Sequence, residues 1–140
     1  MATEQQPATL VDSNVLLDLF TEDGTWSAWS RTRLAEALDR GPVVINQIIY
    51  GEVAHRFSTI EALDEVLTTD RFVRGNLPWT AAFLAAVSYR DYRRRGGQRT
   101  SILPDFFIGA HAAVLGVQLL TRDAARYRTY FPTVDLIAPS

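Results

Sequence analysis

Apolar residues along the chain fall into short runs that alternate with longer stretches of helical spacing. The short runs, rich in β-branched residues, predict strands at 8–11, 42–45 and 117–121, and a last edge strand at 134–137. Apolar residues three and four positions apart predict helices between these runs. We expect these helices at 15–20, 26–38, 46–57, 59–68, 78–95, 104–115 and 123–130.

Turn and cap residues place the helix ends. Asn46 suits the N-cap of the helix that follows the 42–45 strand, and Gly116 marks the end of the 104–115 helix. Strands alternating with helices predict a parallel α/β sheet with both faces covered. With 140 residues and no repeat or linker, we expect a single domain over residues 1–140.

Composition narrows the chemistry. Hydrophobic residues make up 47% and charged residues 21% of the chain, as in folded globular proteins. The absence of cysteine excludes a disulfide scaffold, a thiolate metal site and a cysteine nucleophile. All 14 basic residues are arginine, so mechanisms that need a lysine are excluded too. No secretory signal or membrane span is evident, and we expect a cytoplasmic protein.

Four acids lie either directly after a predicted strand or on the apolar face of a predicted helix. Asp12 and Asp123 each follow a predicted strand, at the edge where open α/β sheets form ligand sites. Both also suit a helix N-cap, and that simpler interpretation stays open. Glu52 follows Ile45, Ile48 and Ile49 at helical spacing and so falls on an apolar stripe.

Asp105 repeats the pattern of Glu52, because small apolar residues follow it at +3, +4 and +7 on its helix. Simpler interpretations exist for both: an ion pair of Glu52 with Arg56, and a first-turn acid favoured by the helix dipole at Asp105. A carboxylate in a core costs several kcal/mol unless it is paired, protonated or metal-bound. If the four acids converge, they form an all-oxygen site suited to Mg²⁺ or Mn²⁺ and to phosphodiester hydrolysis.

Four ordered blocks of the chain resemble the PIN-domain ribonucleases, and specifically the VapC-type toxins of toxin–antitoxin pairs. The blocks are 10–18 (LVDSNVLLD), 49–54 (IYGEVA), 103–112 (LPDFFIGAHA) and 120–124 (LTRDA). The resemblance implies a PIN-like three-layer α/β/α sandwich around a mostly parallel sheet of four or five strands. It also implies an endoribonuclease that uses Mg²⁺, or Mn²⁺ in its place, on transfer or ribosomal RNA.

The same resemblance implies partners and site residues. The partners are a DNA-binding, VapB-like antitoxin and a second copy of the chain, as a homodimer or as a heterotetramer or hetero-octamer with the antitoxin. Catalytic and metal-binding roles fall on Asp12, Glu52, Asp105 and Asp123, with Asp123 able to act through water. Supporting hydrogen bonds fall on Ser13, Asn14 and Thr121. RNA contacts are expected from Arg90, Arg93, Arg94, Arg95 and Arg99.

Two other classes of protein stay open. One is a catalytically inactive PIN-fold module that binds RNA or protein. The other is a phospho-accepting receiver domain, which the absence of lysine disfavours. The net charge of −2 does not oppose an RNA partner, because setting aside the four acids leaves 12 acidic residues against 14 arginines. His55 and His111 lack a partner at metal-ligand spacing, and we interpret both as structural.

Overall fold

The computed structural model describes residues 7–21, 24–99 and 102–139. Five strands make up its sheet: β1 (Thr9–Val11), β2 (Val43–Ile45), β3 (Phe72–Arg74), β4 (Gln118–Leu120) and β5 (Leu136–Ile137). The helices are α1 (Ser13–Thr21), α2 (Ser27–Arg40), α3 (Gln47–Ala54), α4 (Ile60–Val66), α5 (Trp79–Arg94), α6 (Leu103–Leu115) and α7 (Ala125–Tyr130). None of the helices in these ranges is both long and apolar enough to cross a membrane.

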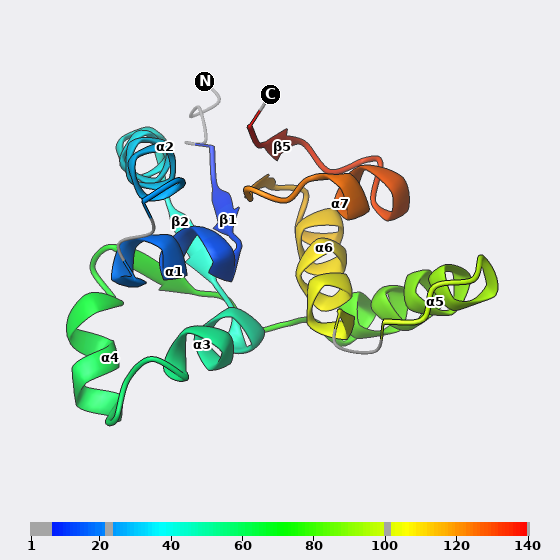
Figure 1. Ribbon diagram of the computed structural model, residues 1–140, viewed down its shortest axis with the longest axis horizontal. Helices are drawn as coiled ribbons and strands as arrows, with labels where there is room; N and C mark the ends of the chain where they lie inside the picture. Colours follow the sequence, from blue (N-terminus) through cyan, green and yellow to red (C-terminus); the bar gives the residue numbers. More distant parts are fainter. Residues whose placement is uncertain (1–6, 22–23, 100–101, 140) are drawn as a thin grey trace, which may run out of the picture.

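The sheet is parallel throughout, with strand order β3-β2-β1-β4-β5. Leu10 of β1 lies in register with Val44 of β2 on one side and Leu119 of β4 on the other. Crossovers between parallel strands are right-handed. The strands after β1 are added first on one side of it and then on the other, so α1–α4 cover one face of the sheet and α5–α7 the opposite face. Figure 1 shows these two helical layers on either side of the strands, which confirms the predicted three-layer α/β/α arrangement.

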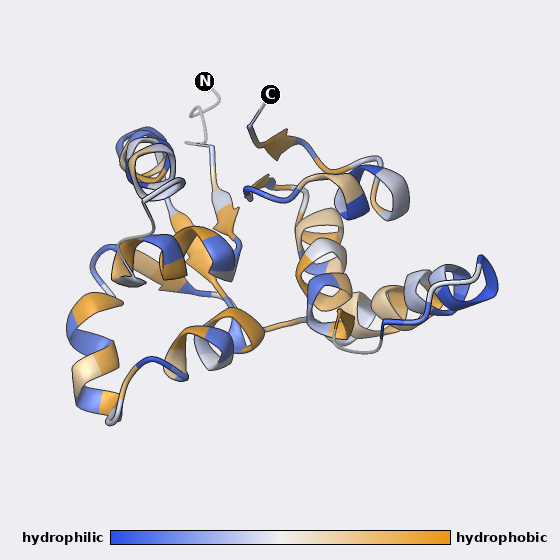
Figure 2. Ribbon diagram, viewed as in Figure 1, coloured by the Kyte–Doolittle hydropathy of each residue, from blue (hydrophilic) through white to orange (hydrophobic). Residues whose placement is uncertain are grey.

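Burial explains why such short strands are stable. All three residues of β1 and of β2 are buried, although successive side chains point to opposite faces of a sheet. Both faces of the central strands are therefore covered by helices, and Figure 2 shows hydrophobic residues along β1 and β2. The predicted Asn46 cap is present, because its side chain accepts a hydrogen bond of 2.9 Å from the Ile49 N–H at the start of α3.

Strand β3 is absent from the sequence-based prediction. Only Phe72 of its three residues is buried, while Val73 and Arg74 are exposed. An edge strand of this length lacks both the apolar run and the clear alternation that identify strands in a sequence. The prediction of four or five strands is nevertheless met, because the sheet has five.

The apolar face of the 78–95 helix does not face the core. Trp79, Phe83 and Val87 are exposed, with Trp79 at 92% of its full accessible surface. Helix α5 instead buries a row of small residues, Ala81, Ala85 and Ser88. Small side chains at this spacing let α5 approach its neighbour α6 closely, so the large apolar residues are displaced to the outer face.

The strand order also locates the edge of the sheet where a ligand site is expected. The order in which strands are added to the sheet reverses between β1 and β4, which are parallel neighbours but are followed by helices of opposite layers. In open α/β sheets the crevice at the carboxyl ends of two such strands is the usual binding site. Asp12 follows β1 and Thr121 follows β4, and the Asp12 N–H donates to the Leu120 carbonyl at 2.8 Å.

Candidate active site

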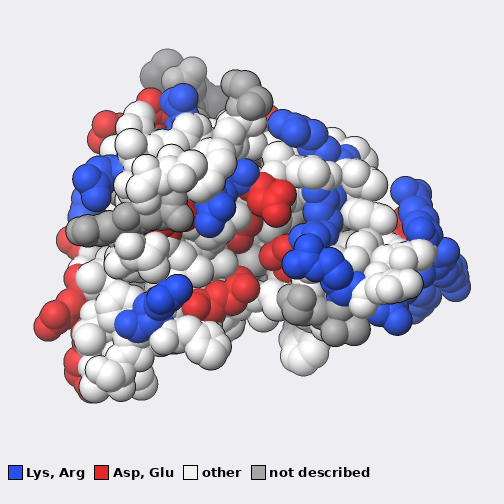
Figure 3. All heavy atoms as spheres, in the orientation of Figure 1, with Lys and Arg blue, Asp and Glu red and all other residues white. Residues whose placement is uncertain are grey.

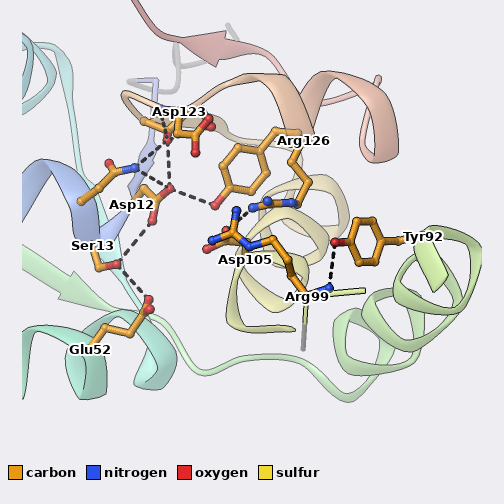
Figure 4. Close-up of polar contacts among 11 residues, drawn as sticks. Asp12, Ser13, Glu52, Tyr92, Arg99, Asp105, Asp123 and Arg126 are labelled. Atoms are coloured by element: carbon orange, nitrogen blue, oxygen red, sulfur yellow. Dashed lines mark hydrogen bonds and ion pairs between the residues drawn. The ribbon is translucent and has the colours of Figure 1, made fainter. Parts of the chain in front are cut away.

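Asp12 is at the centre of the site and is only 3% exposed. Three side chains donate hydrogen bonds to its Oδ2 atom: Thr121 Oγ1 at 2.9 Å, the Tyr127 hydroxyl at 2.9 Å and Asn14 Nδ2 at 3.4 Å. Ser13 Oγ lies 3.5 Å from the other oxygen, Oδ1. Figure 4 shows these contacts converging on Asp12 from the α1 side and from the α7 side. A buried acid that accepts several hydrogen bonds is fixed in orientation.

Glu52 is joined to Asp12 through Ser13. The Ser13 hydroxyl donates to Glu52 Oε1 at 2.8 Å, and Ser13 begins α1 directly after Asp12. Glu52 lies in α3 and is half-buried, in agreement with its place on an apolar stripe. Its predicted alternative partner, Arg56, forms no ion pair with it among the described residues, and the Arg56 side chain is exposed.

Asp105 approaches the site from the opposite helical layer, in the first turn of α6. Arg126 of α7 donates to its Oδ2 atom at 2.6 Å, with side-chain exposures of 31% for the acid and 19% for the arginine. Of the ion pairs within the described ranges, this is the one that involves any of the four predicted acids. Arg126 therefore supplies an ion-paired positive charge at the edge of the acidic group.

Asp123 lies at the rim of the site. Its side chain is exposed, and its N–H donates to Thr121 Oγ1 at 3.1 Å. The interpretation of Asp123 as a helix cap is wrong, because the N-cap of α7 is Ala124 and no side-chain cap hydrogen bond forms there. In Figure 4 the Asp123 carboxylate lies near the network around Asp12 but outside it.

The acids influence one another electrostatically, although they come from separate helices and loops. Burial raises the pKa of Asp12, against hydrogen bonds from Tyr127 and Thr121 that lower it. Burial also raises the pKa of Glu52, and the charge of Asp12 adds to that rise. The pKa of Asp105 is raised to about 7, first by burial and then by the charge of Asp12, despite the opposing charge of Arg126. The site holds more negative charge than its own cations offset.

This donor set fits a hard divalent cation. The available ligands are carboxylate oxygens, which Mg²⁺ and Mn²⁺ prefer, and a nearby cation would oppose the burial and mutual repulsion that raise the pKa values of Glu52 and Asp105. No three of the acidic or histidine side chains in the described ranges are close enough together to enclose an ion by themselves. Mg²⁺ usually takes only one or two carboxylates and keeps several waters, so a site of this kind does not require three converging acids.

Two residues of the site escaped the sequence analysis. Tyr127 is 2% exposed and donates to Asp12, and its own pKa is raised well above its usual value by burial and by the nearby acids. Arg126 precedes it and pairs with Asp105. Consecutive residues of a six-residue helix thus contact two different acids. Their signal in the sequence is only their place just after the 120–124 block.

The five arginines predicted to contact RNA are spread over the second half of α5 and the loop after it. Arg95 pairs with Asp91 at 3.2 Å, and Arg93 donates to the Gln98 carbonyl at 3.3 Å. Arg90 and Arg94 are exposed on the same helix. Arg99 is nearest the acids, because its side chain runs from the α5–α6 connection toward Asp105 (Figure 4).

In the orientation of Figure 1, acidic side chains line a hollow in the middle of the molecule (Figure 3). Basic side chains gather to the right of this hollow and over the far end of α5. The surface therefore places an acidic depression beside a basic rim. A polyanion that reaches the acids would have its flanking phosphates next to arginines.

His111 has a structural role, in agreement with the sequence analysis. It is 1% exposed, and its Nδ1 atom lies 2.9 Å from the Asn46 side-chain nitrogen. Burial lowers its pKa, which favours the neutral ring. The pair connects α6 to the start of α3 and so links the two helical layers near the site.

Comparison with known proteins identifies the family of the chain. The profile of the PIN domain family matches residues 9–132, and the chain therefore belongs to the PIN domain family. No curated protein matches the chain in a sequence comparison.

Solved toxin–antitoxin structures share the fold. VapBC2 from Rickettsia felis, bound to a DNA fragment from its promoter, is similar at 13% identity and a TM-score of 0.71, covering 95% of this chain and 99% of that chain. DNA-bound VapBC from Salmonella typhimurium is similar at 17% identity and a TM-score of 0.68, covering 94% and 98%. A toxin–antitoxin complex from Klebsiella pneumoniae is similar at 24% identity and a TM-score of 0.62, covering 94% and 98%. At these identities the similarity concerns the fold.

Proposed function

We propose that the chain is the toxin of a VapC-type toxin–antitoxin pair and hydrolyses RNA phosphodiester bonds with the aid of Mg²⁺ or Mn²⁺. The observation that carries the proposal is the coupled group of Asp12, Glu52 and Asp105 at the reversal point of the sheet. Their pKa values are raised, and among the described residues the one ion pair that they form is between Asp105 and Arg126. Such a group favours a cation, and a hollow beside a basic rim favours a polyanionic substrate.

In this proposal each residue has a defined task. Asp12 and Asp105 hold the cation, while Glu52 and Asp123 orient water around it. A bound divalent cation lowers the pKa of a water molecule and stabilises charge on the phosphate in the transition state. Ser13, Asn14 and Thr121 keep the acids in place through the hydrogen bonds described above. Arg90, Arg94 and Arg99 bind flanking phosphates of transfer or ribosomal RNA.

The proposed partners follow from the structural neighbours, which are toxin–antitoxin complexes, two of them bound to DNA. We infer a small DNA-binding, VapB-like antitoxin for this chain. We also infer a homodimer of the chain, assembled with the antitoxin as a heterotetramer or hetero-octamer. Co-expression with the product of the neighbouring gene, followed by light scattering, tests both inferences.

The decisive experiment measures cleavage of end-labelled single-stranded RNA and of transfer RNA transcripts by the purified chain. We expect cleavage with Mg²⁺ or Mn²⁺ and none with a chelator. Asp105→Asn and Glu52→Gln are expected to reduce the rate at least about a hundredfold, because each removes a charge from the cation site. Asp39→Asn, an exposed acid of α2, is the matched control and should leave the rate unchanged. Cleavage that resists chelation, or that survives in both site variants, would contradict the proposal.

A catalytically inactive binding module is the second candidate function. The observation that favours it is the Arg126–Asp105 ion pair, which neutralises one acid without a metal. A chain of this kind would bind RNA but show no heat of binding with Mn²⁺ in calorimetry. The same titration therefore separates the two candidates.

A further inference from the structure

The two oxygens of the Asp12 carboxylate have unequal surroundings. Oδ2 accepts from Thr121 Oγ1 at 2.9 Å, from the Tyr127 hydroxyl at 2.9 Å and from Asn14 Nδ2 at 3.4 Å. Among side-chain donors of the described residues, only Ser13 Oγ approaches Oδ1, at 3.5 Å. An ionised carboxylate offers about two acceptor sites on each oxygen. Main-chain N–H groups of Ser13 and Asn14 also hydrogen-bond to this carboxylate. The side-chain donors are therefore concentrated on Oδ2, with one distant hydroxyl at Oδ1.

The neighbouring acids show the same division. Ser13 donates to Oε1 of Glu52, and Arg126 donates to Oδ2 of Asp105. In each case the contact involves one carboxylate oxygen, and the second has no side-chain donor within the described ranges. The site is thus built so that each of these acids offers a single oxygen.

We propose that Tyr127 is a positioning residue for Asp12. The Tyr127 hydroxyl holds Oδ2 of Asp12, so that Oδ1 is the oxygen presented to a divalent cation. This inference rests on the proposed cation-dependent function and assigns a role to a residue outside the acidic group. Tyr127 acts through Asp12 and does not itself contact the cation.

Packing alone does not account for a tyrosine here. The side chain is 2% exposed, and a phenylalanine would fill the same space without bringing a hydroxyl into the core. A buried hydroxyl needs a partner, and the partner in this structure is the acid at the centre of the site. Residues that hold a metal ligand through a hydrogen bond commonly change metal affinity 10- to 100-fold when they are replaced.

Thr121 provides a second, independent hold on the same oxygen. It comes from the end of β4, whereas Tyr127 comes from α7, so the two donors approach from different elements. With both present, rotation of the carboxylate would break two hydrogen bonds of 2.9 Å. With one removed, the Asp12 side chain gains freedom to turn its free oxygen away from the cation.

The test compares Mn²⁺ affinity in the full chain, by titration calorimetry and by electron paramagnetic resonance without RNA. We expect Tyr127→Phe to weaken Mn²⁺ binding by about 10-fold or more. Tyr130→Phe is the matched control, since Tyr130 lies on the same helix and packs its ring on Phe106. That control should leave the affinity unchanged. Circular dichroism and the melting temperature without cations report whether each variant keeps its fold.

A second pair of variants keeps the inference testable if Tyr127→Phe does not fold. Thr121→Val removes the other donor to Oδ2 and is expected to weaken Mn²⁺ binding, whereas Thr121→Ser keeps the hydroxyl and should restore it. The combined Tyr127→Phe and Thr121→Val variant should lose more affinity than the sum of the single losses, because both residues hold one oxygen.

The outcomes separate this inference from the proposed function. A folded Tyr127→Phe variant that binds Mn²⁺ within twofold of the unaltered chain overturns the positioning role alone, as does unchanged binding in Thr121→Val. If the unaltered chain binds Mn²⁺ with the expected losses in the variants but cleaves no RNA, the proposed function fails and the positioning role stands. If the unaltered chain binds no Mn²⁺, both are overturned.

Discussion

Two buried acids at opposite ends of one short segment, Asp12 and Asp18, differ in what faces them. Asp18 is 1% exposed, and its Oδ2 atom lies 2.9 Å from Arg122 Nε and accepts a 2.7 Å hydrogen bond from Ser30. Asp12 is 3% exposed, and its side-chain partners are hydroxyl and amide groups. The charge of Asp18 is thus balanced inside the protein, whereas that of Asp12 is held but not balanced.

On the proposed function, this difference separates a structural acid, Asp18, from a cation ligand, Asp12. The contacts of Asp18 join α1 to α2 and to the loop after β4, and Arg122 also lies 5.7 Å from the Trp26 ring. An acid of this kind stabilises the fold, and its charge is balanced without a bound cation. An acid fixed by neutral donors beside further acids costs stability until an external cation arrives. Burial is thus shared by both acids, and the charge of their partners is what distinguishes them.

The largest expected effect is on cleavage. Asp12→Asn should lower the rate of RNA cleavage on the order of a thousandfold, about 4 kcal/mol of transition-state stabilisation, because it removes a central ligand of the cation. Asp18→Asn, assayed at a temperature where it is folded, should stay within about tenfold of the unaltered chain. Single-turnover assays with saturating Mn²⁺ measure both. Equal losses in the two variants would show that the comparison is mistaken.

The next largest effect is on the free energy of unfolding. Here Asp18→Asn should cause the larger loss and Asp12→Asn the smaller one. Asp18→Asn should lower the free energy of unfolding by about 2–3 kcal/mol, because it leaves Arg122 without its charge partner. Asp12→Asn should cause no such loss in a chelator at pH 8, since the buried charge it removes is unbalanced. Urea unfolding followed by tryptophan fluorescence gives both values. Replacing Arg122 by Gln in the Asp18→Asn background should recover part of the loss, as expected for a coupled pair.

A smaller effect is expected from pH. The folded-state pKa of Asp105 is raised from 3.8 to about 7, so its ionisation opposes folding as pH rises through this interval. In a chelator, the stability of Asp105→Asn relative to the unaltered chain should therefore increase between pH 5 and pH 8, on the order of 2 kcal/mol. Saturating Mn²⁺ should stabilise the unaltered chain more at pH 8 than at pH 5. A pH-independent difference between the two proteins would exclude the raised pKa.

The smallest effect is expected at the exposed arginines. Replacing Arg90 and Arg94 by Gln should leave unfolding within about 0.5 kcal/mol of the unaltered chain. The logarithmic salt dependence of RNA binding should become shallower by about 1.4, as expected when two phosphate contacts to a single strand are lost. Fluorescence anisotropy at several salt concentrations measures the slope. The control replaces Arg40 and Arg71, two exposed arginines outside α5, and should leave the slope unchanged.

The sequence predicted the layers of the fold and the acids, but only part of what surrounds the acids. Glu52 and Asp105 were detectable because an acid on an apolar stripe violates a simple pattern. Tyr127 violates none, since an aromatic residue in a short helix is ordinary. Its role depends on a contact with a residue 115 positions earlier.

Helix α5 shows a second limit. Its strongest apolar pattern belongs to Trp79 and Phe83, yet the buried side consists of Ala81 and Ala85. Hydrophobic spacing identifies a helix reliably, but it does not decide which side packs when the neighbouring helix approaches closely. Strand β3 was missed for a related reason, because an edge strand needs few buried residues.

The hydrogen bond between Asp12 and Tyr127 can form only late in translation, because the two residues are far apart in the sequence. At about 5–20 residues per second, the ribosome needs about 6–23 s to add the 115 residues between them. During that interval Asp12 has neither of its closest donors, because Thr121 is also a late residue. The nascent chain therefore lacks these contacts of Asp12 until the ribosome has passed Tyr127. On the proposed function, a protein that cuts RNA would become competent only after that point of its own translation.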